Sequence, residues 1–174
     1  MKEILLKSVS TKQLKKNEIL SICKLKDMQW KYGLKSQINW FNENVQNNDI
    51  HNIVFLKGRV IGYALLRKRN FLIKNNNNNY FYYDTNIVSK KYRGLNIGSE
   101  LSRLTQKVIK KSGLHAMLIC EKKMELFYSK RGWNKKNRNK SKISDHKYSK
   151  KYSMMVHNAG KRLTKENIQY CIFS

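Results

Sequence analysis

A chain of 174 residues with 40% hydrophobic content has the size of one domain with a single core, and it is apolar enough to fold rather than stay disordered. No apolar run approaches the roughly 20 residues that a membrane span needs, and Met1 to Ile4 show no secretory signal. Three widely spaced cysteines argue against a disulfide framework and a metal site. We therefore expect one domain over residues 1–174 of a reduced, cytoplasmic protein, with an ambiguous tail at 158–174.

The formal net charge of +26 comes from 37 lysines and arginines against 11 acids. Abundant lysine and asparagine, with no proline, are typical of an AT-rich genome, so codon bias explains part of this charge. It does not explain why Asp and Glu, whose codons are equally accessible, are so few. A surplus of this size attracts acidic partners such as nucleic acid, an anionic glycan or an acidic carrier protein. Composition leaves both explanations open.

The first part of the chain mixes strand and helix patterns. Ser10 to Gln13 has the form of a capping box, which predicts a helix start immediately after it. Lys57 and Gly58 separate two apolar runs and predict a hairpin turn. The elements predicted here, in chain order, are a strand at 2–9, a helix from 14 to about 30–33, a shorter helix at 35–45, and strands at 52–56 and 59–66.

The second part begins with a polar asparagine run at Asn75 to Asn79, which we expect to be an exposed loop tip. A later helix has Ile97, Leu101, Leu104 and Val108 at helical spacing, which predicts one buried stripe. The elements predicted here are a strand at 80–88, a helix at 99–111 capped by Gly113, a strand at 115–119, a helix at 122–131, and a strand at 148–157.

Tyr92-Arg93-Gly94-Leu95-Asn96-Ile97-Gly98 is the most informative segment, because it joins a predicted strand to a predicted amphipathic helix. The start of a helix leaves backbone N–H groups without acceptors inside the helix, and the helix dipole adds positive potential there. Two glycines let the turn reach positive φ and let a ligand approach the backbone. Arg93 supplies a cation. The segment predicts a phosphate or pyrophosphate site.

Two blocks together resemble a known family. The pattern Val88-x-x-x-Tyr92-Arg93-Gly94-x-x-Ile97-Gly98 resembles the acetyl-CoA pyrophosphate loop of the GNAT N-acetyltransferase superfamily. Leu126 to Trp133 resembles the superfamily's late helix and its exit. The stretch Cys120 to Trp133 is similar to the branch of aminoglycoside 2′-N-acetyltransferases and nodulation acyltransferases. Glu121 departs from the more common superfamily form, which has Asn there.

The resemblance implies an α/β (α+β) fold of the GNAT type. Its central sheet is mixed and mostly antiparallel, about four helices flank it, and one parallel pair of strands splays apart to hold the pantetheine arm. Acetyl-CoA is the implied cosubstrate, and no metal is implied. The residues implied to bind it are Ile87, Val88, Arg93, Gly94, Leu95, Asn96, Ile97, Gly98 and Ser99.

Acetylation of an amine needs a base for the amine and an acid for the leaving thiolate. Tyr128 occupies the aromatic position whose hydroxyl, in the superfamily, points toward the CoA sulfur, so it is the candidate acid; the alternative is a core tyrosine. Asp84 lies four residues before Val88, on the same strand face, and is the candidate base. Its alternative is an ion-pair partner for a nearby cation. Cys120 is expected to be an ordinary strand-end residue rather than a nucleophile.

Two further features bear on the acceptor. Residues 130–151 form a basic strip with ten lysines and arginines against Asp145, which is either a docking site for an acidic macromolecule or a solvated, lysine-biased loop. Aromatics at Trp30, Tyr32, Trp40 and Phe41 could line an acceptor wall, although Phe41 and one tryptophan are expected in the core.

The sequence therefore predicts an acetyl-CoA-dependent N-acetyltransferase that acts on a small amine such as an amino sugar. An acidic acyl-carrier donor or a protein amine is the alternative, and an idle module that binds nucleic acid is the third possibility. The oligomeric state, monomer or homodimer, stays open.

Overall fold

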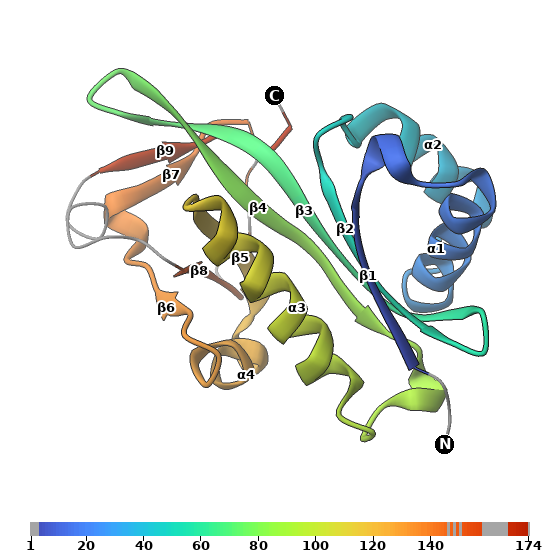
Figure 1. Ribbon diagram of the computed structural model, residues 1–174. Coiled ribbons are helices and arrows are strands. Elements are labelled where there is room, and N and C mark those ends of the chain that lie inside the picture. Colours follow the sequence, from blue (N-terminus) through green and yellow to red (C-terminus); the bar gives the residue numbers. More distant parts are fainter. Residues whose placement is uncertain (1–3, 146, 148, 150, 158–166, 174) are drawn as a thin grey trace. The chain divides into compact units, whose positions relative to one another are not determined.

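The computed structural model describes residues 4–145, 147, 149, 151–157 and 167–173 (Figure 1). The α-helices are α1 (Lys16–Gln29), α2 (Leu34–Asn44), α3 (Ile97–Ser112) and α4 (Glu125–Ser129). The strands are β1 (Ile4–Ser10), β2 (Ile50–Leu56), β3 (Arg59–Ile73), β4 (Asn76–Val88), β5 (His115–Glu121), β6 (Asn134–Lys135), β7 (Ser141–Ile143), β8 (Tyr152–His157) and β9 (Ile168–Tyr170). Short 3-10 turns are η1 (Thr11–Gln13), η2 (Lys90–Tyr92), η3 (Lys122–Met124) and η4 (Arg138–Lys140).

The sheet is mixed, with hydrogen-bonded order β1-β2-β3-β4-β5-β8-β6. Strands β1 and β2, β2 and β3, β5 and β8, and β6 and β8 pair antiparallel, whereas β4 and β5 pair parallel. The parallel ladder runs from Tyr80–His115 to Tyr82–Met117, while the strands themselves continue to Val88 and Glu121. The expected fold class, including the parallel pair and the four helices, is confirmed.

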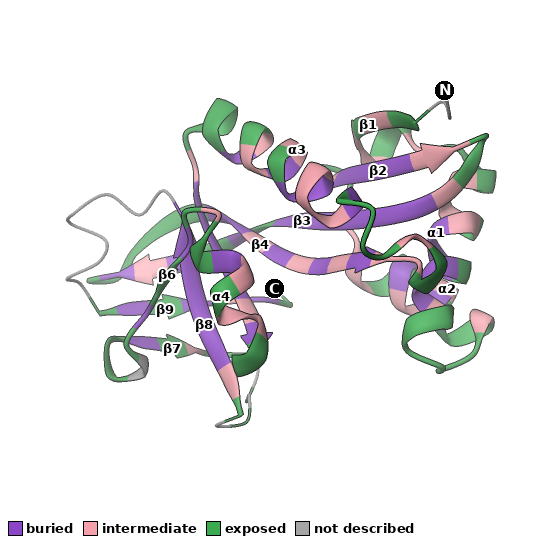
Figure 2. Cartoon of the chain, turned by 90° about the horizontal axis from the view of Figure 1, so that it is seen from below, coloured by how far each residue is buried: buried purple, intermediate pink, exposed green. Residues whose placement is uncertain are grey.

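The chain forms two compact units, residues 1–67 with 85–107 and residues 68–84 with 108–174. In the first unit, Ile22 and Leu25 of α1 pack with Ile53, Tyr63 and other buried residues of β2 and β3. Figure 2 shows both of these strands buried over most of their length. Continuous rather than alternating apolar runs, such as the one in β2, are typical of strands covered on both faces.

One glycine of this unit lies at a tightly packed point of the sheet. A Cβ added at Gly62 in β3 would stand 3.2 Å from the Val54 Cγ2 atom and 3.4 Å from the Ile97 Cγ2 atom. The distance to Val54 is shorter than most carbon–carbon contacts, and the distance to Ile97 is at their lower limit. The absence of a side chain at Gly62 therefore lets the first residue of α3 pack directly on the sheet.

The second unit has its own core of aromatic and apolar side chains from β3, β4, β5, β8 and β9, among them Phe71, Tyr80, Met117 and Tyr170. The His115 Nε2 atom lies 2.6 Å from the Tyr170 hydroxyl, and the Tyr80 hydroxyl donates to the Cys171 carbonyl over 2.9 Å. The described end of the chain, 167–173, is therefore a structural part of this core rather than an appendage.

Several predicted boundaries are wrong. Gln13 does cap Ser10, because the Gln13 Oε1 atom accepts the Ser10 N–H over 3.0 Å, but the box starts η1 and α1 begins only at Lys16. Residues Asn76–Asn79 are exposed yet belong to β4, so the loop tip is only the turn at Lys74 and Asn75, both with positive φ. The predicted strand at 148–157 begins at Tyr152, and Tyr148 lies outside the described residues.

The predicted helix at 122–131 is also wrong in form, because it is the turn η3 followed by the five-residue α4. In α3 the buried residues are Ile97, Leu101, Ser102, Thr105 and Ile109, while Leu104 and Val108 are only half-buried. Thr105 can enter the buried stripe because its hydroxyl donates to the Leu101 carbonyl over 2.8 Å and accepts from the Asn52 amide over 3.2 Å.

Candidate active site

The glycine turn of the first unit folds as a set of short backbone bonds. The Ser89 N–H donates to the Ile61 carbonyl over 2.8 Å, which ties the end of β4 to β3. After η2 the chain passes through Gly94 at φ +82 and Asn96 at φ 60. The Asn96 carbonyl then accepts from the N–H groups of Ser99 and Glu100. Asn96 is therefore the residue that caps α3, and the two positive φ values make the turn that aims the helix start.

This geometry leaves the N–H groups of Ile97 and Gly98 without an acceptor inside the helix, and the 16-residue helix adds positive potential at the same end. No described atom lies within 4 Å of the point where a Cβ of Gly94 would stand. A Cβ at Gly98 would lie 3.8 Å from the Val88 Cγ2 atom, which places the helix start against the end of β4. The arrangement suits an anion that approaches the backbone.

Arg93 does more than was expected of it. Its Nε donates to the Val88 carbonyl over 3.1 Å and its Nη2 donates to the Gln29 Oε1 atom over 2.7 Å. The guanidinium thus fastens the turn to the end of β4 and to the last residue of α1. It stays exposed beside the turn, so it contributes positive charge there while its donors hold protein atoms.

Strand β4 presents two faces of different character. Tyr83, Thr85 and Ile87 are buried, whereas Asp84 and Val88 alternate with them and are half-buried. This confirms that Asp84 and Val88 share a face. The Ile87 side chain belongs to the core of the first unit.

Tyr128 lies in α4 of the second unit with only 7% of its surface exposed. Its ring meets the Tyr83 ring edge to face, with centroids 6.2 Å apart, and the Trp133 ring at 6.1 Å. The Tyr128 carbonyl accepts from the N–H groups of Arg131 and Trp133, which closes the end of the helix. Since Tyr83 leaves β4 on the face opposite to Asp84, Tyr128 packs on the opposite side of the strand from the candidate base.

Phe127, the residue before Tyr128, is only half-buried, and the Arg131 guanidinium lies 3.7 Å from its ring centroid. The two rings nevertheless touch edge to face, with centroids 5.1 Å apart. The Tyr128 ring is thereby enclosed by aromatic neighbours from two elements, which fixes where its hydroxyl points.

Beside Tyr128, α4 is held by its first residue. The Ser153 hydroxyl and the Lys135 ammonium both bond the Glu125 carboxylate, the lysine at 2.9 Å. The serine hydrogen bond, with the lysine second, lowers the pKa of Glu125. Burial, and secondarily Glu125, raises the pKa of the Cys120 thiol to about 11. Cys120 therefore stays protonated at neutral pH, as a structural rather than nucleophilic cysteine does.

The sequence model of the acetyltransferase (GNAT) family matches residues 18–133, which is more than half of the chain and includes both β4 and α4. The chain belongs to the GNAT acetyltransferase family. A search of curated proteins found no match to it.

Solved structures agree with this GNAT assignment at the level of the fold. ElaA from Escherichia coli is 12% identical, with a TM-score of 0.66 over 89% of this chain and 99% of that one. The GNAT family N-acetyltransferase YhbS from Escherichia coli, solved in complex with CoA, is 14% identical, with a TM-score of 0.69 over 98% and 91%. The PaiA N-acetyltransferase from Thermoplasma acidophilum, in complex with coenzyme A, is 15% identical, with a TM-score of 0.56 over 89% and 98%.

On the expected acceptor side of this GNAT chain, the aromatics divide as predicted. Phe41 is buried and Trp40 is half-buried against the core, whereas Trp30 and Tyr32 are exposed. Between α1 and the end of β4 lies a cavity of about 30 Å³, which is about the volume of one water molecule. Leu25, Met28, Gln29 and Ile87–Lys90 line it.

Among the described residues, no helix has the length and apolar content that a bilayer-spanning segment requires. No group of three or more His, Cys, Asp and Glu side chains gathers there as metal ligands do.

The basic strip at 130–151 is not uniformly exposed to solvent. Lys135 pairs with Glu125, and Lys136 is only 6% exposed. Lys140 and Lys142 are exposed, whereas the side chain of Arg138 lies outside the described residues.

Sequence analysis missed three residues that position the site: Gln29, Tyr83 and Ser153. Tyr83 had one available signal, since strand alternation places it opposite Asp84.

Proposed function

We propose that this GNAT-family chain is an acetyl-CoA-dependent N-acetyltransferase that transfers the acetyl group to a primary amine of a small molecule, such as an amino sugar, in the cytoplasm. The observation that carries the proposal is the turn from Gly94 to Gly98, where two positive φ values aim the start of α3 at open space. The combination of backbone N–H groups without helical acceptors and the helix dipole is suited to binding a pyrophosphate. YhbS and PaiA, which have the same fold, were solved with CoA.

In this proposal the backbone N–H groups of the turn at residues 94–98, those of Ile97 and Gly98 foremost, hold the pyrophosphate of CoA, with Ser99 at the same helix start and Arg93 supporting the turn. The backbone of Ile87 and Val88 pairs with the pantetheine amides and orients the thioester carbonyl. Fixing the carbonyl in place converts a bimolecular reaction into one between pre-positioned groups. A backbone N–H at this position also stabilises the oxyanion that forms when the amine attacks.

The reaction itself is a direct transfer. The amine nitrogen forms a bond to the thioester carbon and loses a proton to Asp84, directly or through a water. As the C–S bond breaks, Tyr128 donates its phenolic proton to the departing sulfur and later regains one from solvent. In this proposal Asp84 acts on the amine nitrogen and Tyr128 on the sulfur of the same tetrahedral intermediate.

The experiment that tests this proposal measures release of free CoA thiol from acetyl-CoA with a panel of small amines, alongside calorimetric titration with CoA. We expect thiol release that depends on an amine and yields the N-acetyl product by mass spectrometry. A protein that binds CoA but releases no thiol with any amine or peptide would contradict the catalytic assignment. Binding of nucleic acid by the same protein would then favour an idle module.

A further inference from the structure

The cavity of about 30 Å³ beside the end of β4 has a mostly apolar lining. It is lined by Leu25, Met28 and Gln29 of α1 and by Ile87, Val88, Ser89 and Lys90 at and after the end of β4. All seven residues belong to the first unit, so the cavity is complete within that unit. A void with mostly apolar walls is a poor site for water and a good one for an apolar group.

The cavity has one closed side and one side toward solvent. Leu25 and Ile87 are 3% and 5% exposed, and both belong to the hydrophobic core of the first unit. Met28 is 61% exposed. An occupant therefore meets close-packed core atoms at its inner end and one adaptable side chain, Met28, on the solvent side.

Arg93 fixes the width of the cavity, because it connects the two walls. Its Nε donates to the Val88 carbonyl over 3.1 Å on the β4 side, and its Nη2 donates to the Gln29 Oε1 atom over 2.7 Å on the α1 side. The Ser89 N–H, which donates to the Ile61 carbonyl over 2.8 Å, ties the same end of β4 to β3. Moving the walls apart would break these hydrogen bonds, so the cavity resists widening around a larger occupant.

The cavity adjoins the backbone that is proposed to orient the thioester, because Ile87 and Val88 contribute to both. Its volume of about 30 Å³ is about that of one water molecule, and a methyl group is of similar size. We propose that the cavity receives the methyl end of the donor's acyl group and that Leu25 and Met28 limit the length of the acyl chain. The inference rests on the proposed function, from which it takes the position of the thioester.

A longer acyl chain lacks space in this cavity. In a hydrophobic pocket, one methylene too many lowers kcat/KM about 10- to 200-fold. Butyryl-CoA has two more methylenes than acetyl-CoA, so we expect it to be used about 100-fold less well or worse. The transfer step is the same for both donors, since the amine nitrogen bonds to the thioester carbon as the C–S bond breaks. The difference between the donors therefore reports how well the acyl chain fits.

The first arm of the experiment locates the methyl group without any acceptor. Acetyl-CoA labelled with ¹³C in its acetyl methyl group is added to the protein, and nuclear Overhauser effects from that group are recorded. We expect effects to the side-chain methyl groups of Leu25 and Ile87. Effects confined to other side chains overturn the inference and leave CoA binding intact. If acetyl-CoA does not bind at all, the proposed function fails and this inference fails with it.

The second arm measures thiol release from acetyl-CoA and butyryl-CoA with the same amine. Met28→Ala opens the solvent side without removing a buried side chain, and it should lower the acetyl-to-butyryl ratio of kcat/KM about tenfold or more. Leu25→Ala enlarges the closed side and should change the ratio in the same direction, with thermal unfolding as the check that it folds. Leu20→Ala is the matched control and should leave the ratio unchanged. Leu20 is exposed on the same helix, about 12 Å along the axis from Met28, and does not line the cavity.

Two results of the second arm overturn the inference. These are a wild-type protein that uses butyryl-CoA as well as acetyl-CoA, and equal ratios in Met28→Ala, Leu20→Ala and the wild type. A general loss of activity in a variant does not imitate the expected result, because the ratio compares two donors with the same amine. A protein whose Leu25 contacts the acetyl methyl group but which acetylates no amine contradicts the catalytic part of the proposed function and supports the methyl site.

Discussion

Gly94 offers a substitution that separates CoA binding from folding. Its φ of +82 is unfavourable for other residues, so a side chain there costs about 1–2 kcal/mol of strain. No clash adds to this cost, because no described atom lies within 4 Å of the Cβ position. Since domains of this kind have roughly 5–15 kcal/mol of stability, Gly94→Glu should stay folded.

The effect on CoA should be much larger than the effect on folding. The new carboxylate would stand in front of the N–H groups of Ile97 and Gly98, where the pyrophosphate is proposed to bind. At a separation of about 5 Å, each phosphate charge meets a repulsion of about 1–3 kcal/mol for effective dielectric constants between 80 and 20. Two phosphate charges, with the lost access to the backbone, should raise the Kd for CoA by about 100-fold or more.

Calorimetric titration with CoA and thermal unfolding measure the two effects separately. Gly94→Ala introduces the strain without the charge and should weaken CoA binding far less. Gly113→Glu has the same kind of backbone, with φ +68 and open space, but lies at the other end of α3, about 24 Å away along the helix. A folded Gly94→Glu protein whose Kd stays within about threefold of the wild type would refute the pyrophosphate assignment, as would an equal loss in Gly113→Glu.

Four further predictions test the remaining assignments. Tyr128→Phe should lower kcat by about 10- to 1,000-fold without changing CoA affinity, and wild-type turnover would show that the thiolate finds another donor. Asp84→Asn should lower turnover and remove the acidic limb of the pH–rate profile; an unchanged profile would leave Asp84 with a structural role only. Reversing the charges of Lys140 and Lys142 should leave turnover on a small amine unchanged at any salt concentration, and a large, salt-sensitive loss of binding to an acidic macromolecule would instead favour the docking alternative. Burial lowers the pKa of His51 to about 4, so the unfolded chain binds its proton first, and stability should fall as the pH drops from about 6.5 toward 4; the fall in Tm should be smaller in His51→Gln, and equal slopes would contradict this.

Local patterns predicted the parts of the fold and site that depend on short stretches of chain. Strand alternation placed Asp84 and Val88 on one face of β4, because successive side chains of a strand point to opposite sides. The glycine turn was recognisable because positive φ favours glycine and Asn96 tolerates it, and both positions have positive φ. These features need no knowledge of what packs against them.

Contacts between distant segments could not be predicted from local sequence patterns. Gln29 receives the Arg93 guanidinium across 64 positions of the sequence, and no local pattern marks it. Strands β6, β7 and β9 have two or three residues each, which is too short to show a period of two. Thr105 was left out of the α3 stripe because its burial depends on a hydrogen bond to Asn52, which lies on β2.

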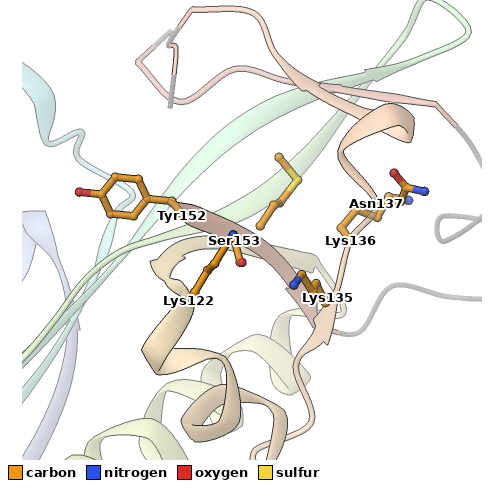
Figure 3. A pocket seen from close by; sticks show the side chains of 7 residues that line it. Lys122, Lys135, Lys136, Asn137, Tyr152 and Ser153 are labelled. Atoms are coloured by element: carbon orange, nitrogen blue, oxygen red, sulfur yellow. The ribbon is translucent and has the colours of Figure 1, made fainter. Parts of the chain in front are cut away.

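The lysine surplus gains meaning from where the lysines lie rather than from their number. Codon bias adds lysines without regard to position, and a lysine on the surface costs the fold almost nothing. A buried ammonium costs several kcal/mol unless its surroundings compensate, so folding should reject lysines from the interior first. Lys26 and Lys136 are each only 6% exposed. The Lys26 ammonium lies 3.6 Å from the Trp40 ring centroid, which compensates it by a cation–π interaction. Lys136 lines a pocket of about 590 Å³ together with Lys122 and Lys135 (Figure 3). An explanation of the net charge of +26 should therefore start from these two buried lysines, whose positions the fold constrains, rather than from the many lysines on the surface.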